Sequence, residues 1–240
     1  MTDHTTYGLV CSELSEDLSK TNLGELKLDS FQDNSVKIKI KAASLNFPDL
    51  LMTQGKYQNR PNLPFALGME GAGIVEEVGS GVSSFKEGDE VMFGGWGHGA
   101  IAESIILPEG LVSLKPKSLN FSEAASFKTA YLTAYVGLIR RGELKQGETL
   151  LVHGASGGVG MAAVQMGKLY GARVIASGTS DEKLKIVKTW GADEIINTGL
   201  EGSVSFREEV KDLTDGKGAD VIYDPVGGDV FDESIRCINW

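Results

Sequence analysis

Three glycines spaced three residues apart carry the strongest chemical signal in the chain. Gly154, Gly157 and Gly160 follow the apolar run 150–152 and stand where a helix should begin. Glycine lets the backbone turn sharply and approach a phosphate, and a helix start offers unpaired N–H donors with the positive end of the dipole. This pattern predicts a dinucleotide pyrophosphate site. It is a variant, because Ala155 replaces the second glycine of the usual G-x-G-x-x-G spacing.

The end of the next strand favours one dinucleotide over the other. An NAD site usually places an acidic side chain about 20 residues past the glycines, where it binds the ribose 2′-OH. No acid stands at 176–180; small hydroxyl side chains occupy this stretch, and Lys183 follows one turn into the next helix. These groups suit a 2′-phosphate, so we predict NADPH as the cofactor. The alternative interpretation of Lys183 is a solvated helix lysine.

The predicted cofactor contacts therefore come from two turns. The first turn is expected to hold the pyrophosphate, and the second to hold the adenosine ribose with its phosphate. The residues assigned to the two turns are Gly154, Ser156, Gly157, Gly158, Val159, Gly160, Ser177, Gly178 and Lys183.

Strand and helix patterns alternate through the second half of the chain. Strands are predicted at 150–152, 173–176, 195–196 and 221–223. The helices that follow them begin at Val159, after a capping box at 179–182, near Phe206 and at Asp229. This order predicts an α/β domain with a doubly wound parallel sheet. An α/β domain that binds no nucleotide is the alternative.

The first half of the chain reads as a separate, β-rich domain. Alternating apolar and lysine residues predict a half-buried strand at 36–41, and further strands are predicted at 71–78 and 88–93. The stretch 122–141 is predicted to be a helical hinge whose packed positions are Ala125, Thr129, Leu132, Val136 and Ile139. We therefore expect one domain at 1–122 and a second at 123–240, with a ligand cleft between them.

Composition narrows the class of protein. The net charge of −10 opposes binding to nucleic acid, because phosphate backbones repel an acidic surface. Cys11 and Cys237 are too few for a disulfide framework, and no secretory signal is visible, so the expected location is cytoplasmic. No apolar run approaches the roughly 20 residues that cross a bilayer, so no membrane association is expected.

Six segments, in order along the chain, match the motifs of a known family: 42–49, 55–57, 67–73, 132–135, 154–160 and 224–228. With them the chain resembles the zinc-independent quinone oxidoreductases, the zeta-crystallin-like branch of the medium-chain dehydrogenase/reductase superfamily. The resemblance implies a GroES-like β domain followed by a Rossmann domain that binds NADPH. It implies reduction of quinones or α,β-unsaturated carbonyls, and it adds Thr133, Val226 and Gly227 to the cofactor contacts.

Residue types speak against a catalytic zinc ion. Such a site needs three protein ligands from Cys, His and carboxylates. Zinc-containing members of the superfamily carry a cysteine and a histidine where this chain has Asn46 and Met69. The three histidines, His4, His98 and His153, are dispersed, and a lone histidine is more often a polar surface or cap residue. No metal is expected.

Without a metal, Asn46 and Tyr57 are the expected catalytic residues. Hydride transfer to an enone or quinone spreads the negative charge, which a few hydrogen-bond donors can stabilise. By the resemblance both residues lie beside the nicotinamide, where the Tyr57 hydroxyl is expected to act as a hydrogen-bond donor and not as a base. The alternatives are a turn-shaping role for Asn46 and a loop-anchoring role for Tyr57. Asp49 is expected to be mainly structural.

Two departures from the family pattern affect these expectations. Asn197 is followed by Thr198, where relatives have a tyrosine near the adenosine phosphate. Relatives also continue beyond Trp240 through two more strands, so we expect a fragment with an unfinished sheet in which strand 221–223 is an exposed edge. A homodimer is an expectation only for the full-length form.

Three interpretations of the function stay open. The first is an NADPH-dependent quinone or enone reductase. The second is an NADPH-binding structural or regulatory protein without significant turnover. The third is a zinc-free alcohol dehydrogenase or an enoyl-thioester reductase, and dependence on a CoA-type substrate would identify the latter.

Overall fold

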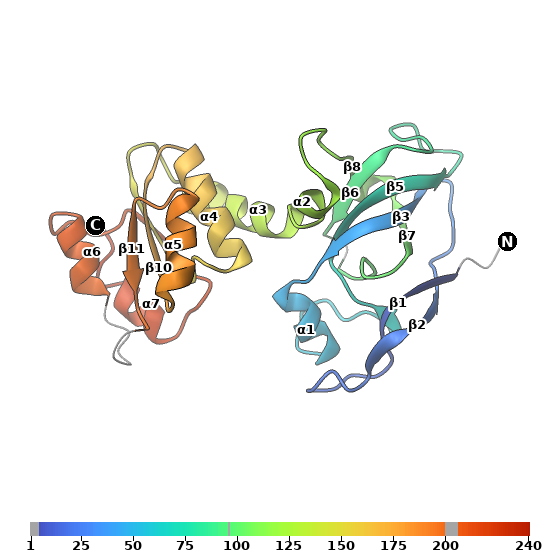
Figure 1. Cartoon of the computed structure of the whole chain (residues 1–240), viewed down its shortest axis with the longest axis horizontal. Helices are drawn as coiled ribbons and strands as arrows, with labels where there is room; N and C mark the ends of the chain where they lie inside the picture. The colour runs from blue at the N-terminus through green and yellow to red at the C-terminus, as the bar shows by residue number, and fades with distance from the viewer. Residues whose placement is uncertain (1–4, 96, 200–205) are drawn as a thin grey trace. The chain divides into compact units, whose positions relative to one another are not determined.

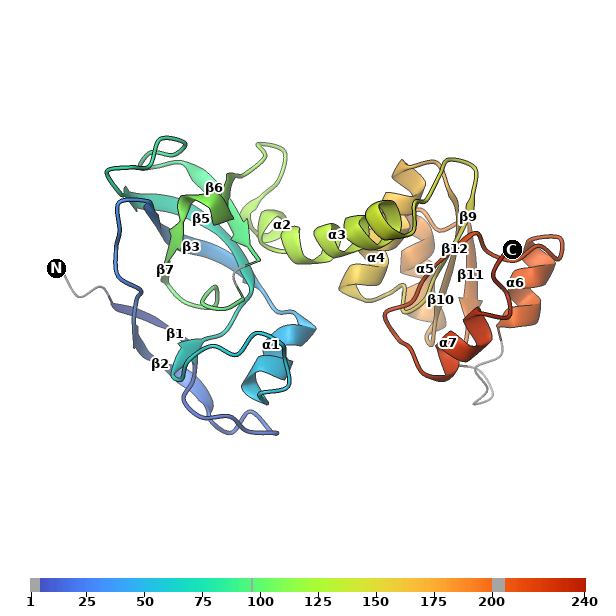
Figure 2. The ribbon, with the colours of Figure 1, turned by 180° about the vertical axis from the view of Figure 1, so that it is seen from behind.

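The computed structural model describes residues 5–95, 97–199 and 206–240 and divides the chain into two compact units, Met1–Thr129 and Ala130–Trp240 (Figures 1 and 2). The α/β fold class is confirmed, with a β-rich first unit and a second unit in which strands and helices alternate. No helix of the described residues is long and apolar enough to cross a membrane.

The first unit contains two antiparallel sheets. Its strands are β1 (Thr5–Cys11), β2 (Thr21–Lys27), β3 (Ser35–Ser44), β4 (Phe65–Ala66), β5 (Glu70–Val78), β6 (Glu90–Gly94), β7 (Ser104–Pro108) and β8 (Val112–Leu114). The sheets run β7-β3-β5-β6-β8 and β2-β1-β4. The predicted alternation in β3 is confirmed, because Val36 and Ile38 are fully buried in the core of the larger sheet. A helix, α1 (Phe47–Thr53), and a single 3₁₀ turn, η1 (Glu109–Leu111), interrupt the strands.

The predicted hinge at 122–141 is helical but not continuous. It consists of α2 (Phe121–Ala125), α3 (Lys128–Tyr135) and a π-helical segment, η2 (Val136–Arg141). Of the predicted packed positions, Ala125 is buried and Ile139 packs against the core, whereas Leu132 is 56% exposed and Val136 49% exposed. The buried positions of α3 and η2 are Ala130, Ala134 and Leu138. Small alanines let the α3 backbone approach the core closely, and the prediction followed the larger side chains instead.

The second unit is a four-stranded parallel sheet with helices between its strands. Its elements are β9 (Thr149–Val152), α4 (Gly158–Leu169), β10 (Arg173–Gly178), α5 (Asp181–Thr189), β11 (Glu194–Asn197), α6 (Arg207–Leu213), β12 (Val221–Tyr223) and α7 (Asp229–Ser234). The strand order β11-β10-β9-β12 confirms the expected doubly wound order.

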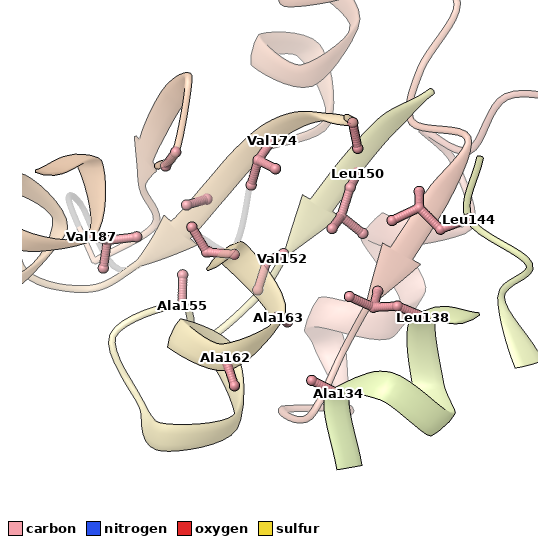
Figure 3. Packing of buried hydrophobic residues seen from close by; sticks show 14 of the residues in the cluster. Ala134, Leu138, Leu144, Leu150, Val152, Ala155, Ala162, Ala163, Val174 and Val187 are labelled. Atoms are coloured by element: carbon pink, nitrogen blue, oxygen red, sulfur yellow. The ribbon is translucent and has the colours of Figure 1, made fainter. Parts of the chain in front are cut away.

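The strands of the second unit are apolar on both faces because both faces are covered. Leu150, Val152 and Val174 belong to a cluster with residues of α3 and α4 (Figure 3). Leu151 and Ile175, which point the other way, pack with residues of α6 and α7. Such two-sided burial explains why the strand sequences read as continuous apolar runs.

Two local details qualify the predictions. The predicted edge position of β12 is confirmed within the described part of the chain, although a bridge pairs Ala219, just before β12, with Ile238.

The predicted capping box at 179–182 is wrong. The N-cap of α5 is Ser180, whose hydroxyl accepts the Lys183 N–H at 3.4 Å, so Glu182 lies one position too early to close the box.

Candidate functional site

The glycine turn between β9 and α4 is tightly folded against the start of the helix. Gly154 adopts a φ of +56°, and its carbonyl accepts the N–H of Gly157, the N-cap of α4, at 2.9 Å. A Cβ atom at Gly160 would lie 2.3 Å from the Gly154 oxygen and 2.8 Å from the Ala155 Cα. Only glycine fits there, so the helix start lies directly against the turn.

The solvent-exposed part of this turn consists mainly of backbone atoms. Ser156, Gly157 and Gly158 are exposed, and the first N–H groups of α4 have no acceptor within the helix. Val159 is partly buried and packs on the core. Ala155 is fully buried, and its N–H donates to the Ser177 carbonyl at 3.0 Å, so the departure from the usual glycine spacing serves a core contact.

The loop after β12 lies beside the glycine turn. The space next to Gly154 is bordered by Val226, whose Cγ2 would be 3.3 Å from a Cβ there. The Asp224 carboxylate shapes this loop by accepting the N–H groups of Val226 at 2.8 Å and Gly227 at 3.0 Å. Two of the three residues that the resemblance added are thus near the glycine turn, and Thr133 is exposed on α3.

The residues assigned to the ribose and its phosphate, in the turn after β10, differ in their exposure to solvent. Gly178 is buried, Ser180 is half-buried, and Lys183 is exposed at the start of α5. Ser177 differs, because its hydroxyl lies in the interior, 2.7 Å from a ring nitrogen of His153. The Ser177 side chain therefore has a protein partner in place of the predicted phosphate.

In the first unit, Asn46 lies at the start of α1 within a side-chain network. Its Nδ2 donates toward Ser44 Oγ at 3.0 Å and Glu70 Oε1 at 3.1 Å, and Ser44 Oγ donates to the same Glu70 oxygen at 2.6 Å. Nδ2 carries two N–H donors, and both acceptors belong to the same network. Ser44 and Glu70 therefore fix the orientation of the Asn46 amide.

Glu70 is the centre of this network, and the sequence analysis did not single it out. The residue is 1% exposed, and its Oε2 accepts the Thr129 N–H at 2.7 Å. Burial lowers the pKa of the neighbouring Lys128, while the Glu70 charge opposes that shift. A lone glutamate inside the apolar segment 65–75 is the signal that could have identified it, since an acid is rarely buried without partners.

Asp49 and Tyr57 follow Asn46 in the sequence, and their surroundings differ. Asp49 is buried and accepts the N–H groups of Asn46 at 2.7 Å and Gly68 at 3.1 Å, which confirms its structural role. Burial raises the pKa of Asp49. Tyr57 is half-buried, and its ring packs against a cluster that contains Met52 and Phe65, so the loop-anchor contact is present.

The two histidines among the described residues, His98 and His153, lie in different surroundings. The described residues contain no group of three or more His, Cys, Asp or Glu that could hold an ion. His98 is half-buried edge-on to Phe65, with its pKa lowered by burial. His153 is 1% exposed, so the expectation of a surface or cap residue is wrong for it. His4 lies outside the described residues.

Comparisons with known proteins match both halves of the chain. Residues 32–117 match the alcohol dehydrogenase GroES-like domain, and residues 158–239 match the zinc-binding dehydrogenase family. A quinone oxidoreductase-like protein 2 homolog of Nematostella vectensis is 38% identical over 97% of the chain, which spans 62% of that relative.

Solved structures agree with the sequence matches. The Escherichia coli quinone oxidoreductase complexed with NADPH is 32% identical, with a TM-score of 0.86 over 98% of this chain and 70% of that one. The CurK enoyl reductase is 30% identical, with a TM-score of 0.87 over 98% of this chain and 71% of that one.

Proposed function

This chain belongs to the medium-chain dehydrogenase/reductase superfamily, in its quinone oxidoreductase branch, and from that premise we propose that it is part of an NADPH-dependent oxidoreductase. Its acceptor is a quinone or an α,β-unsaturated carbonyl, and no zinc ion takes part. The observation that carries the proposal is the glycine turn, where a side chain at Gly160 would collide with backbone and where helix N–H groups are exposed.

The residues present fit NADPH. The backbone of 156–160 would hold the pyrophosphate, and the turn 178–180 with Lys183 would hold the adenosine ribose and its 2′-phosphate. Thr133, Val226 and Gly227 would complete the contacts. When bound, NADPH supplies the hydride.

The first unit supplies the groups that would act on the acceptor. Glu70 and Ser44 hold the Asn46 amide in a fixed orientation, and this amide is the first donor that would stabilise negative charge on an enolate or quinol oxygen. Tyr57 is the second donor, held by the packing of its ring. A delocalised anion needs less stabilisation than the localised alkoxide of a simple ketone, which is why two neutral donors can replace a metal here.

The test is the oxidation of NADPH, followed at 340 nm, with 1,4-benzoquinone, with 2-cyclohexenone and with a simple ketone. We expect turnover with the first two only, in protein that contains no stoichiometric zinc. Tyr57→Phe should lower turnover and leave NADPH affinity nearly intact; unchanged turnover would remove Tyr57 from the mechanism. Stoichiometric zinc would contradict the metal-free chemistry.

An enoyl-thioester reductase is the second candidate, and the similarity to the CurK enoyl reductase favours keeping it. A crotonyl thioester added to the same assay separates the two, because strong preference for the thioester over both small acceptors would select this candidate. NADPH that binds and is never oxidised would favour a structural or regulatory role. Cytoplasmic location and a full-length homodimer stay predictions from the sequence.

A further inference from the structure

His153 occupies the junction between β9 and the glycine turn. Its backbone N–H donates to the Tyr223 carbonyl at 3.0 Å, which extends the pairing of β9 with β12 by one residue. Its imidazole is buried and lies against the Phe206 ring with a centroid separation of 4.6 Å. A polar ring in this position needs hydrogen-bond partners, and it has one on each nitrogen.

The partners of the ring determine its tautomer. Ser234 of α7 lies 3.0 Å from Nε2, and the single hydroxyl hydrogen of Ser234 is donated to the Val230 carbonyl at 2.7 Å. Ser234 can therefore only accept from the ring, so Nε2 carries the proton. Burial lowers the pKa of His153 to about 4, which keeps the ring neutral near pH 7. Nδ1 is then an acceptor, and the Ser177 hydroxyl donates to it at 2.7 Å.

This bond joins the two turns assigned to the cofactor. Ser177 is fixed to the glycine turn twice, through its hydroxyl to His153 and through its carbonyl to the Ala155 N–H. The next residues, 178–180, form the turn at the end of β10 where a dinucleotide presents its adenosine ribose. Because the only hydrogen of the Ser177 hydroxyl goes to His153, Ser177 has no donor left for a phosphate.

We propose that His153 is a positioning residue that acts through Ser177 to fix the turn 178–180 against the glycine turn, and thereby sets how tightly the 2′-phosphate of NADPH is held. The inference rests on the proposed function for its ligand. It predicts that breaking the bond between His153 and Ser177 affects NADPH more than NADH, because only NADPH has a phosphate in the displaced turn.

The hydrogen-bond network itself is tested without any ligand. Nitrogen-15 NMR of the imidazole should show that the His153 ring is neutral at pH 7, with Nε2 protonated and Nδ1 unprotonated. A protonated Nδ1 would overturn the proposal, because Ser177 could not then donate to the ring.

The positioning role is tested with Ser177→Ala and His153→Gln, each checked for folding by circular dichroism and thermal melting. The matched control is Thr214→Ala, which removes another buried hydroxyl of the second unit that bonds to the Val210 carbonyl and the Gly218 N–H. We expect Ser177→Ala to weaken NADPH binding about tenfold and NADH binding less than about threefold. Thr214→Ala should change the ratio of the two affinities less than about twofold.

Because Ser177→Ala and His153→Gln break the same bond, the double variant should be no worse than either single one. Equal losses for NADPH and NADH, or additive losses in the double variant, would overturn the proposal. If the unaltered chain binds no NADPH, the proposed function and the positioning role both fail, and the NMR result still reports separately on the network.

Discussion

In the second unit the candidate site is made of backbone, whereas in the first unit it is made of side chains. The glycine turn exposes N–H groups because Gly154 adopts a positive φ and because Gly160 allows a close approach to backbone that no other residue permits. The Asn46 network depends on residues that are distant in the sequence. Glu70 is 24 residues from Asn46, and Thr129, whose N–H binds Glu70, is a further 59 residues along the chain. The glycine turn is therefore determined by residues that are close in the sequence, whereas the Asn46 network forms only when the fold brings distant residues together.

The strongest test of this difference is Gly160→Ala. The added methyl would collide with the Gly154 oxygen and the Ala155 Cα, both backbone atoms that cannot move aside cheaply. We expect NADPH affinity to fall more than about 100-fold, with a stability loss on the order of 3 kcal/mol. Calorimetric titration with NADPH and urea denaturation measure the two effects.

Gly158→Ala is the control for that substitution. Gly158 is the first residue of α4, it is exposed, and a Cβ there meets nothing within 4 Å. Alanine favours a helix, so stability should be unchanged or slightly higher. If the two alanine variants behaved alike, close approach of the backbone would not explain the site.

Acid should weaken the second unit through His153. The folded-state pKa of about 4 lies below the ordinary 6.5, because burial opposes the charged ring more than the Asp224 charge favours it. The neutral ring therefore contributes stability that is fully present above pH 6.5 and is lost as the pH falls toward 4.

The expected size of this acid effect is about 2 kcal/mol between pH 7 and pH 5. Urea denaturation of the unaltered chain and of His153→Gln at both pH values isolates it, since the variant lacks the titrating ring. Equal pH dependence in the two proteins would contradict the buried, neutral state of His153.

Glu70→Gln tests the side-chain network of the first unit. The amide keeps the size of Glu70 but presents one acceptor oxygen and one donor NH2 group in place of two acceptor oxygens. Either the Thr129 N–H or the pair formed by Asn46 and Ser44 therefore loses its acceptor. We expect turnover with a quinone to fall about tenfold while NADPH affinity changes less than about twofold. Glu77→Gln, at an exposed position of the same strand, should change neither. A parallel fall in affinity and turnover would mean that Glu70 supports the fold alone.

Lys183→Ala should give the smallest effect. Lys183 is exposed, so its attraction to a 2′-phosphate is screened, and we expect NADPH affinity to fall about fivefold without a change for NADH. Lys185→Ala, also exposed on α5, is the control. Titrations at low and moderate salt check the prediction, because the loss should shrink as salt rises; identical losses for both lysines would support the solvated-lysine interpretation.

The sequence predicts most of the second unit because its signals are local. Glycine spacing, apolar runs and their alternation with helices identify β9 to β12 and their order. Leu132 and Val136 were wrongly predicted as packed positions, because small alanines of α3 face the core instead. The roles of Glu70, Ser177 and His153 depend on residues that only the folded sheets bring together, so spacing along the chain gives no sign of them.

The measurement that tests the account most directly is a pair of fluorescence titrations of the unaltered chain with NADPH and with NADH. Every site described in the second unit is assigned to a dinucleotide whose adenosine ribose carries a 2′-phosphate. We predict that NADPH binds at least about tenfold more tightly than NADH, which corresponds to about 1.4 kcal/mol. Equal affinities would contradict the assignment of the turn after β10, and no binding of either would contradict the cofactor site itself.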